Sequence, residues 1–244
     1  MSHRGPEFRI GTSGYQYKHW RGVFYPERLP QKHWLRYYSE HFDTVEINNT
    51  FYHLPSEKSF DQWRKQAAHG FLYALKFSRY GTHMKKLKDP QEPIERFMKL
   101  AERLNGFLGP ILVQLPPRWH VDAERLSGFL SSVPPGQRWA VEFRDASWFR
   151  DDIYSILQKH NAALCFHDMI EDHPQNVTAQ WIYWRFHGTA GHAGNYSQEQ
   201  LRAEAEVIKR YLARGLDVFA YFNNDVHGYA IANALELRRL ALSG

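Results

Sequence analysis

The sequence predicts an α/β protein with a (β/α)8 TIM-barrel fold, in a single domain that spans residues 1–244. Short apolar runs alternate with segments of helical periodicity, which is the pattern of repeated βα units around a parallel sheet. Eight such runs can be counted, and the length of 244 residues is near that of a typical TIM barrel. No linker rich in Pro, Gly or Ser divides the chain. An open doubly wound sheet, which normally has about five or six strands, is therefore the weaker alternative.

The predicted strands are short apolar segments that end in polar or turn-forming residues. The strand at 8–10 enters a Gly-Thr-Ser-Gly segment, and the strand at 111–115 is stopped by Pro116 and Pro117. We predict strands at residues 8–10, 44–47, 72–77, 111–115, 139–143, 163–166, 182–186 and 218–222.

Segments of helical periodicity fill the intervals between these strands. Ser56 is predicted as an N-cap, and Ser197 with Gln200 fits a capping box. We predict helices at about residues 32–41, 56–68, 93–104, 123–131, 149–160 and 198–213, and from 228 onward. The segment that follows the strand at 163–166 and the residues His167 and Asp168, and that ends at Gln180, is predicted to be irregular, with room for one short helix.

Composition limits the class of protein. The single Cys165 excludes an internal disulfide framework and a thiolate zinc cluster. Residues 1–8 contain no apolar signal core, and no segment reaches the roughly 18 consecutive apolar residues of a membrane span. We therefore predict a cytoplasmic protein with no membrane contact; the sequence indicates no particular oligomeric state.

The net charge of +5 mildly favours anionic ligands, either small metabolites or nucleic acid. Lys and Arg residues are scattered along the chain, and the densest basic run, at 83–88, is short enough to be a solvated loop. Charge alone therefore makes nucleic acid only a minor alternative partner.

Polar residues lie at or near the carboxyl end of every predicted strand. Side chains alternate between the two faces of a strand, so Glu46 and Asn48 share one face while Val45 and Ile47 share the other. The apolar side chains of each strand are expected to face the helices. The polar side chains on the opposite face are expected to point into the barrel mouth, where TIM-barrel active sites lie. The polar set comprises Thr12, Ser13, Glu46, Asn48, Lys76, Gln114, Glu142, Arg144, His167, Asp168, Arg185, His187, Tyr221, Asn223 and Asn224.

The catalytic candidates are the ionisable members of this set. Glu46 and Glu142 are the preferred acid/base residues, and a glycosidase-like carboxylate pair is an alternative for them. Lys76 could form a Schiff base if its amine were desolvated or placed near Arg, whereas an electrostatic role beside a carboxylate is simpler. The predicted catalytic residues are Glu46, Lys76, Glu142, His167 and Asp168.

The remaining residues are predicted to bind substrate. Arg144 and Arg185, with Lys76, suggest that the substrate carries a phosphate or carboxylate. His167, Asp168, His187 and Glu142 could instead ligate a divalent metal, but the sequence is poor in the His pattern of a multinuclear site, so the cofactor is left unknown and no metal site is assigned. The predicted substrate-binding residues are Thr12, Ser13, Asn48, Gln114, Arg144, Arg185, His187, Tyr221, Asn223 and Asn224.

Two loops admit two interpretations each. The aromatic loop (Tyr15, Tyr17, Trp20, Phe24 and Tyr25) could stack on bases or sugars, or it could be pinned by its own hydrophobic cluster. The Gly-rich segment 188–194 could be a mobile lid or a plain surface loop. No Walker motif, dinucleotide fingerprint or G-x-S-x-G elbow is present.

Motifs along almost the whole chain resemble the DUF72 family, also called YecE-like proteins. They are IGTSGY at 10–15, FYP at 24–26, TVEINNTFY at 44–52, QLPP at 114–117, VEFR at 141–144, SW at 147–148 and YFNN at 221–224. The resemblance implies a TIM barrel related in shape to xylose-isomerase and endonuclease-type barrels, in a family without a settled activity. Tyr15 stands where many members carry Trp, and Asp145 where His is frequent.

The leading functional hypothesis is an enzyme (a hydrolase, lyase or isomerase) that acts on a small anionic substrate, including phosphorylated ones, in the barrel mouth. The alternatives are a nucleic-acid-binding protein related to repair and a non-catalytic binding protein that retains the fold.

Overall fold

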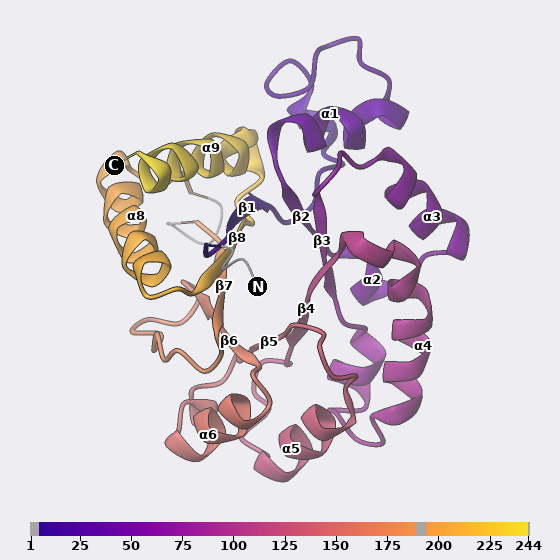
Figure 1. Ribbon diagram of the computed structural model, residues 1–244, viewed down its shortest axis with the longest axis vertical. Helices are drawn as coiled ribbons and strands as arrows, with labels where there is room; N and C mark the ends of the chain where they lie inside the picture. Colours follow the sequence, from indigo (N-terminus) through magenta and orange to yellow (C-terminus); the bar gives the residue numbers. More distant parts are fainter. Residues whose placement is uncertain (1–4, 189–193, 244) are drawn as a thin grey trace.

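The strands form a nearly closed barrel in which β1 lies between β8 and β2 (Figure 1). The computed structural model describes residues 5–188 and 194–243. All eight predicted strands are present, and hydrogen-bonded neighbours are parallel in the order β1-β8-β7-β6-β5-β4-β3-β2. The strands are β1 (Phe8–Thr12), β2 (Thr44–Ile47), β3 (Leu72–Lys76), β4 (Leu108–Gln114), β5 (Trp139–Glu142), β6 (Ala163–His167), β7 (Trp181–Phe186) and β8 (Asp217–Phe222). The predicted TIM-barrel fold is confirmed.

The barrel closes where β1 approaches β2. Ser13 and Glu46 form a parallel bridge, and the Gly14 amide donates a hydrogen bond of 2.8 Å to the Glu46 carbonyl. A Cβ atom added to Gly11 would lie 2.1 Å from the Thr44 carbonyl oxygen. Only glycine therefore permits this close approach of the two backbones.

Helices surround the barrel, and the predicted helices are confirmed to within a few residues (Figure 1). Ser56 and Ser197 cap their helices as predicted, the latter in a capping box. The long helices are α1 (Trp34–His41), α3 (Glu57–Gln66), α4 (Gln91–Ala101), α5 (Ala123–Ser132), α6 (Asp151–Lys159), α8 (Gln198–Ala213) and α9 (Tyr229–Leu242).

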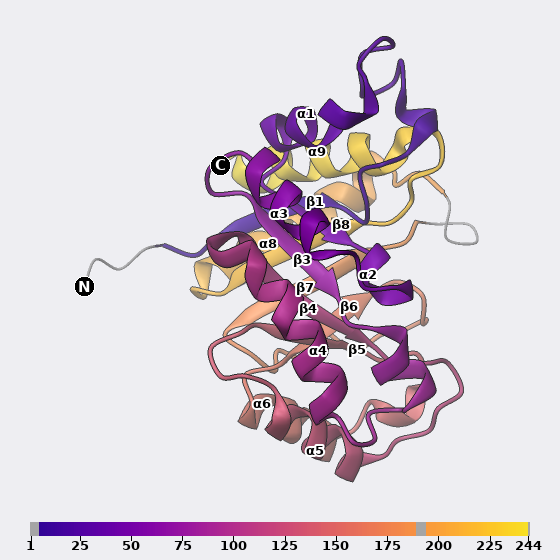
Figure 2. The same cartoon turned by 90° about the vertical axis from the view of Figure 1, so that its right-hand side faces the viewer.

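Short helical turns in the loops were not predicted. They are η1 (Lys18–Trp20), η2 (Gln31–His33), α2 (Asn49–Tyr52), the π-helix η3 (Tyr80–Met84), η4 (Glu102–Phe107), η5 (Ala146–Trp148) and η6 (Val226–Gly228). Residues 168–180, between β6 and β7, are irregular and contain no helix. In the side view, α2 lies at the end of the barrel opposite to the segment that leads into β1, so it marks the mouth (Figure 2).

The predicted alternation of side chains divides the interior into two cores. Residues such as Val45, Ile47 and Val141 pack outward against the helices. The inner core fills the barrel with Ala74, Leu112, Ala140, Ala163, Cys165, Trp181, Tyr183, Phe219 and Tyr221. This apolar plug forms the floor beneath the polar residues of the mouth.

The aromatic loop after β1 is held by its own hydrophobic cluster. Trp20 and Tyr25 are fully buried, and the Tyr25 ring stacks on Trp34 of α1 with centroids 4.5 Å apart. Trp20 and Tyr25 are therefore not available to stack on a ligand. The predicted lid falls mostly on residues 189–193, which lie outside the described residues.

No helix in the described part of the chain combines the length and apolar character needed to span a bilayer. The cytoplasmic location stays a prediction.

Candidate functional site

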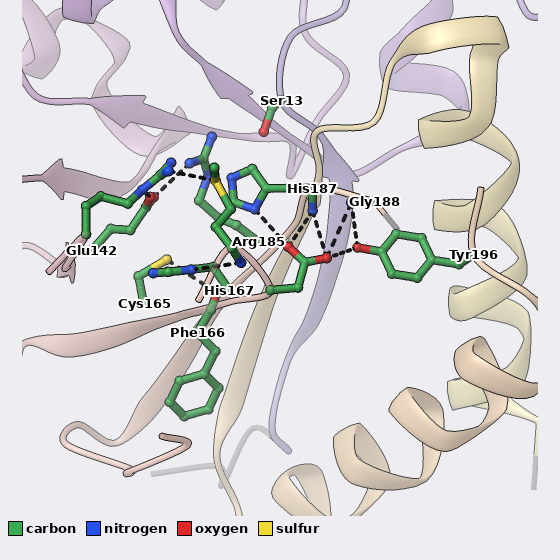
Figure 3. A network of polar contacts seen from close by, with 12 residues as sticks. Ser13, Glu142, Cys165, Phe166, His167, Arg185, His187, Gly188 and Tyr196 are labelled. Carbon is green, nitrogen blue, oxygen red and sulfur yellow. Dashed lines mark hydrogen bonds and ion pairs between the residues drawn. The ribbon is translucent and has the colours of Figure 1, made fainter. Parts of the chain in front are cut away.

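Arg185, at the end of β7, joins two buried carboxylates of the barrel mouth, those of Glu46 and Glu142. Figure 3 shows Arg185 together with Glu142. Its Nη2 lies 2.9 Å from Glu46 Oε1, and its Nη1 lies 2.7 Å from Glu142 Oε2. The side chains of all three residues are at most 2% exposed. The polar parity of β2, β5 and β7 therefore converges on one ion-pair network, as the alternation predicts.

Both carboxylates have further hydrogen-bond donors. Ser13 Oγ and Tyr183 Oη each donate to Glu46 over 2.7 Å. Gln114 Nε2 donates to Glu142 Oε1 over 2.8 Å, and Arg144 Nε donates to the same oxygen. The carboxylates are thus saturated by protein groups.

This saturation argues against the predicted acid/base role of Glu46 and Glu142. Burial, the largest single influence, would raise the pKa of both carboxyl groups. Arg185 and the other donors and positive charges together outweigh it, and they hold the pKa of Glu46 below, and that of Glu142 well below, the ordinary value. Both groups stay ionised, and neither is exposed to a ligand. The sequence could not reveal this, because it gives the face of each side chain but not its partner.

Lys76, at the end of β3, has a different environment. Its side chain is 7% exposed, and Nζ lies 4.4 Å from the centroid of the Phe51 ring. Within the described structure, Nζ makes no hydrogen bond and no ion pair within 4.0 Å of a carboxylate. Burial, followed by the positive charge of Arg185, lowers the pKa of Lys76 to about 8. The amine is thus desolvated and near Arg, and both conditions favour the neutral amine that forms a Schiff base.

His83 joins this part of the mouth, although no feature of the sequence marks it as a site residue. Its ring lies 5.0 Å from the Phe51 ring, and its Nδ1 lies 2.9 Å from Thr82 Oγ1. Because that hydroxyl donates to the Ser78 carbonyl, Nδ1–H must be the donor and Nε2 an acceptor. Burial, followed by the charges of Lys76 and Arg79, lowers the pKa of His83 to about 4. Its place in a π-helix in the loop after β3 is a signal that only the structure supplies.

Asp168 is bound by residues at and after the end of β7, namely His187, Gly188 and Tyr196, which Figure 3 labels. It accepts hydrogen bonds from the His187 amide over 2.9 Å, the Gly188 amide over 3.3 Å and the Tyr196 hydroxyl, and its Oδ1 lies 3.0 Å from His187 Nδ1. Burial alone would raise the pKa of Asp168, but the hydrogen bonds from His187 and Tyr196 outweigh it and lower the pKa to about 2. This arrangement indicates a structural clamp.

His167 is also engaged by the backbone. Its Nε2 lies 2.8 Å from the Phe143 carbonyl, and the Met169 amide donates to its Nδ1 over 3.3 Å. Burial lowers the pKa of His167, so the neutral ring with a proton on Nε2 fits both contacts. Neither nitrogen faces the Lys76 side of the mouth with a free lone pair, so the structure gives no support to a catalytic role.

Three predicted substrate-binding residues lie elsewhere. Thr12 faces outward because it lies two residues after Ile10, which also faces outward, and alternate residues of a strand share a face. Its Oγ1 lies 2.9 Å from the Tyr38 hydroxyl. Tyr221 lies in the floor, with its hydroxyl 2.9 Å from Thr44 Oγ1. Asn224 follows the end of β8, where strand alternation no longer applies, and donates to Asn233 of α9 over 2.9 Å. Thr12 therefore does not point into the mouth, Tyr221 lies beneath it and Asn224 is bound to α9. The substrate-binding roles of these three residues stay predictions.

Asn48 and Asn223 remain at the rim as half-buried residues. The Asn48 Oδ1 is buried and accepts no hydrogen bond from the described residues. Asn48 also lines a cavity of about 150 Å³ between the loops after β1 and β2, together with Ser13, Tyr17 and Trp63. The Asn48 amide is thus placed where it could orient a ligand, and a binding role of Asn223 stays a prediction.

The four residues considered as metal ligands do not converge. Asp168 and His187 contact each other, His167 contacts backbone groups, and Glu142 is bound by arginines. Across residues 5–188 and 194–243, no three His, Cys, Asp or Glu side chains gather in a way that could hold a metal ion. The donor set considered from the sequence does not fit a metal in this structure.

Comparisons with known proteins agree with this fold. The chain is 30% identical over 124 residues to the UPF0759 protein YecE of Escherichia coli K12, a match that covers 47% of this chain and only 43% of that protein. It is 23% identical over 262 residues to the UPF0759 protein YunF of Bacillus subtilis 168, which covers 90% of this chain and 92% of that protein.

Solved structures extend the likeness to the whole chain. A DUF72 family protein from Thermotoga maritima MSB8 superposes with a TM-score of 0.86 at 29% identity, covering 97% of this chain and 100% of that chain. A DUF72 family protein from Enterococcus faecalis V583 gives a TM-score of 0.80 at 19% identity over 99% of this chain and 100% of that chain, a likeness of fold alone. The family pattern described as "Protein of unknown function DUF72" matches residues 9–243. The chain therefore belongs to the DUF72 family.

Proposed function

We propose that the protein is an enzyme that acts on a small anionic substrate, such as a phosphorylated or carboxylated compound, in the barrel mouth. The observation that carries this proposal is the charge balance of the mouth. Three cationic side chains (Lys76, Arg144 and Arg185) accompany two carboxylates (Glu46 and Glu142), and Lys76 has no carboxylate partner within 4.0 Å. An anion would supply the missing charge.

The proposal assigns new roles to the mouth residues. Lys76 and Arg144 hold the anionic group, because Lys76 has no ion-pair partner and Arg144 is 18% exposed. Arg185, Glu46 and Glu142 act as positioning residues, which fix the field and the geometry of the mouth without touching the substrate. The structure thus favours the β3 side of the mouth over the carboxylate pair as the place of reaction.

Anion binding can be measured directly. Inorganic phosphate and a panel of small phosphorylated and carboxylated compounds should raise the melting temperature of the wild-type protein in proportion to occupancy. Arg144→Met should weaken binding by about tenfold or more, the loss expected for a charge-assisted contact. Arg150→Met is the matched control, because Arg150 pairs with Asp152 on the surface at 3.0 Å. Equal stabilisation of both variants by phosphate would contradict the proposal.

One observation favours nucleic acid as a second candidate ligand. Tyr52, Tyr80 and Met84 are 67%, 41% and 69% exposed, on the loops after β2 and β3. The same rim carries the cations Arg79, Lys85, Lys86 and Lys88, and aromatic rings beside cations are typical of single-strand binding surfaces. This candidate predicts a DNA affinity that falls as the salt concentration rises. The affinity should be unchanged in Glu142→Gln and lost in Tyr80→Ala.

A further inference from the structure

We propose that Lys76 forms a protonated Schiff base with the substrate, so that the substrate is an aldehyde or ketone that also carries an anionic group. The inference rests on the proposed function, because it assigns the reaction to the same mouth. It adds the chemical class of the reacting group and the residue that bonds to it.

The geometry separates Lys76 from the other lysines. Among the lysines of the described chain, Lys76 alone is buried. Both carboxylates near it are bound by Arg185, whereas a typical lysine such as Lys209 pairs with Glu206 at 3.1 Å. The side chain instead ends against the Phe51 ring. An amine that is desolvated and lacks a counter-ion is easily deprotonated, and the free amine is the nucleophile.

The free amine is well populated near neutral pH. Burial and the charge of Arg185 lower the pKa of Lys76 from 10.5 to about 8. At pH 7, the unprotonated fraction is then on the order of 10²-fold larger than for an ordinary lysine. A carbonyl compound held by Arg144 would meet this amine first.

The reaction balances with groups present in the mouth. The Lys76 nitrogen bonds to the carbonyl carbon, the amine loses one proton and the carbonyl oxygen gains one, which gives a carbinolamine. The nitrogen lone pair then forms the C=N bond while the C–O bond breaks, and the oxygen leaves as water after a second protonation. This second proton is the one that the Lys76 ammonium released to become the free amine, so the ammonium and the carbonyl compound together give the iminium ion and one water molecule. The neutral His83, whose Nε2 carries a lone pair, is the residue we assign to carry protons between the two atoms.

The Glu46 and Glu142 carboxylates favour the product. Both lie close enough to raise the pKa of Lys76 by their charge, so they also favour the positive charge of an iminium ion. They would do so without direct contact, because their oxygens are occupied by Arg185 and its neighbours. An apolar floor beneath the mouth would limit the access of water to the C=N bond.

Reductive trapping tests the inference. The full chain would be treated with sodium cyanoborohydride and either pyruvate or glycolaldehyde phosphate, with acetone and glycolaldehyde as uncharged counterparts. Intact-protein mass would count the adducts, and peptide mapping would locate them. We expect one adduct, at Lys76, formed about tenfold faster from the anionic probes, since a charge-assisted contact to Arg144 holds them. Its rate should rise as the pH passes through about 8.

Two variants sharpen the test. Lys76→Arg keeps the charge but cannot form an imine, so it should lose the adduct. Lys209→Met, the matched control, should keep the adduct and the stabilisation by phosphate. Because the adduct is located in the wild-type protein, the result does not depend on the folding of any variant.

The outcomes separate the two proposals. Modification of many lysines at equal rates, or an unmodified Lys76 in a protein that phosphate stabilises, would overturn the Schiff base and leave anion binding standing. A protein that neither phosphate nor the anionic probes stabilise would overturn the proposed function, and with it this inference.

Discussion

At the scale of single residues, Arg185 is the group on which the stability of the charged mouth depends most, because it pairs with both buried carboxylates. Two carboxylates without solvent exposure depend on its guanidinium, since burial alone would raise the pKa of both. A buried ion pair stabilises little compared with an apolar replacement of all its members, but removing one member leaves an uncompensated charge. The network therefore behaves as a unit.

Arg185→Met should lower the free energy of unfolding by about 3–5 kcal/mol at pH 7, the range for breaking a buried pair. The loss should shrink as the pH falls toward 5, because without Arg185 the pKa of Glu46 and Glu142 would be high and both groups would become neutral. Urea unfolding at the two pH values measures both effects. Arg150→Met, at a surface pair, should change the free energy by about 0.5 kcal/mol or less. A loss below that of the control would show that the mouth relaxes and hydrates.

Removal of the Lys76 charge should raise the free energy of unfolding, whereas removal of the Arg185 charge should lower it. Its folded-state pKa of about 8 lies below the ordinary 10.5, so between these values the unfolded chain binds a proton that the native chain does not. Stability therefore rises with pH across this window, and the full cost of burying the charge is present below it. Lys76→Met should stabilise the protein at pH 7 by about 1–3 kcal/mol.

The gain from Lys76→Met should decrease as the pH rises from 8 toward 10.5. Unfolding by urea at pH 7 and pH 9.5, compared with Lys209→Met, measures the difference. A destabilised Lys76→Met variant would mean that the ammonium has a partner in solution. A residue kept at a cost to stability is consistent with a functional role.

At the scale of elements, the strands were the most predictable part of the molecule. Each is a continuous run whose alternation is imposed by tertiary burial, so the faces of Glu46, Glu142 and Arg185 could be read from the sequence. Thr12 was assigned to the mouth although its parity with Ile10 places it outward. Asn224 lies beyond β8, where the pattern carries no information.

The loops were less predictable for a physical reason. The short α2 and the π-helix η3 are stabilised by packing at the mouth and not by helical periodicity, so no pattern marks Phe51 or His83. Likewise the sequence could not choose between a carboxylate partner and an aromatic one for Lys76. That choice depends on distances, and it changes the chemistry assigned to the residue.

Asp168 stabilises the connection between β6 and β7. This connection, residues 168–180, contains no helix. Its pKa of about 2 lies below the ordinary 3.8, so its contribution is fully present above pH 4 and is lost as the pH falls through 2. Asp168→Asn should lower the free energy of unfolding at pH 6 by about 1–2 kcal/mol, because charge-assisted bonds to His187 and Tyr196 are lost. Asp172→Asn is the control, because Asp172 is exposed on the same segment at φ 53°, which Asn tolerates.

Urea titrations of both Asp variants at pH 6 and pH 3 provide the measurement. The difference between Asp168→Asn and the wild-type protein should be smaller at pH 3 than at pH 6. An equal difference at both pH values would show that the amide replaces the hydrogen bonds but disturbs packing. Asp168 would then not act through its charge.

At the scale of the whole molecule, the site depends on closure of the barrel. The network joins Ser13, which directly follows β1, and Glu46 of β2 to Glu142 of β5 and Arg185 of β7. These residues meet because β1 lies against β2 and closes the barrel. Few regular hydrogen bonds join β1 to β2, chiefly those at the bridge between Ser13 and Glu46. The weakest seam of the barrel thus ends directly at the site.

Gly11→Ala tests this seam. The added methyl group would lie 2.1 Å from the Thr44 carbonyl oxygen, a backbone atom that can move only if β1 and β2 separate. We expect a loss of about 1–3 kcal/mol or more, the cost of overpacking. Gly128→Ala is the matched control, because Gly128 is exposed in α5 with nothing within 4 Å of its added Cβ, and it should stabilise the helix by about 0.5–1 kcal/mol. Hydrogen exchange of the Gly14 amide, which donates to Glu46, should accelerate in the first variant alone. If Gly11→Ala unfolds with wild-type stability and leaves that exchange unchanged, β1 and β2 are not in tight contact, and the position of Glu46 in the mouth must be fixed by its side-chain contacts with Arg185 and Tyr183.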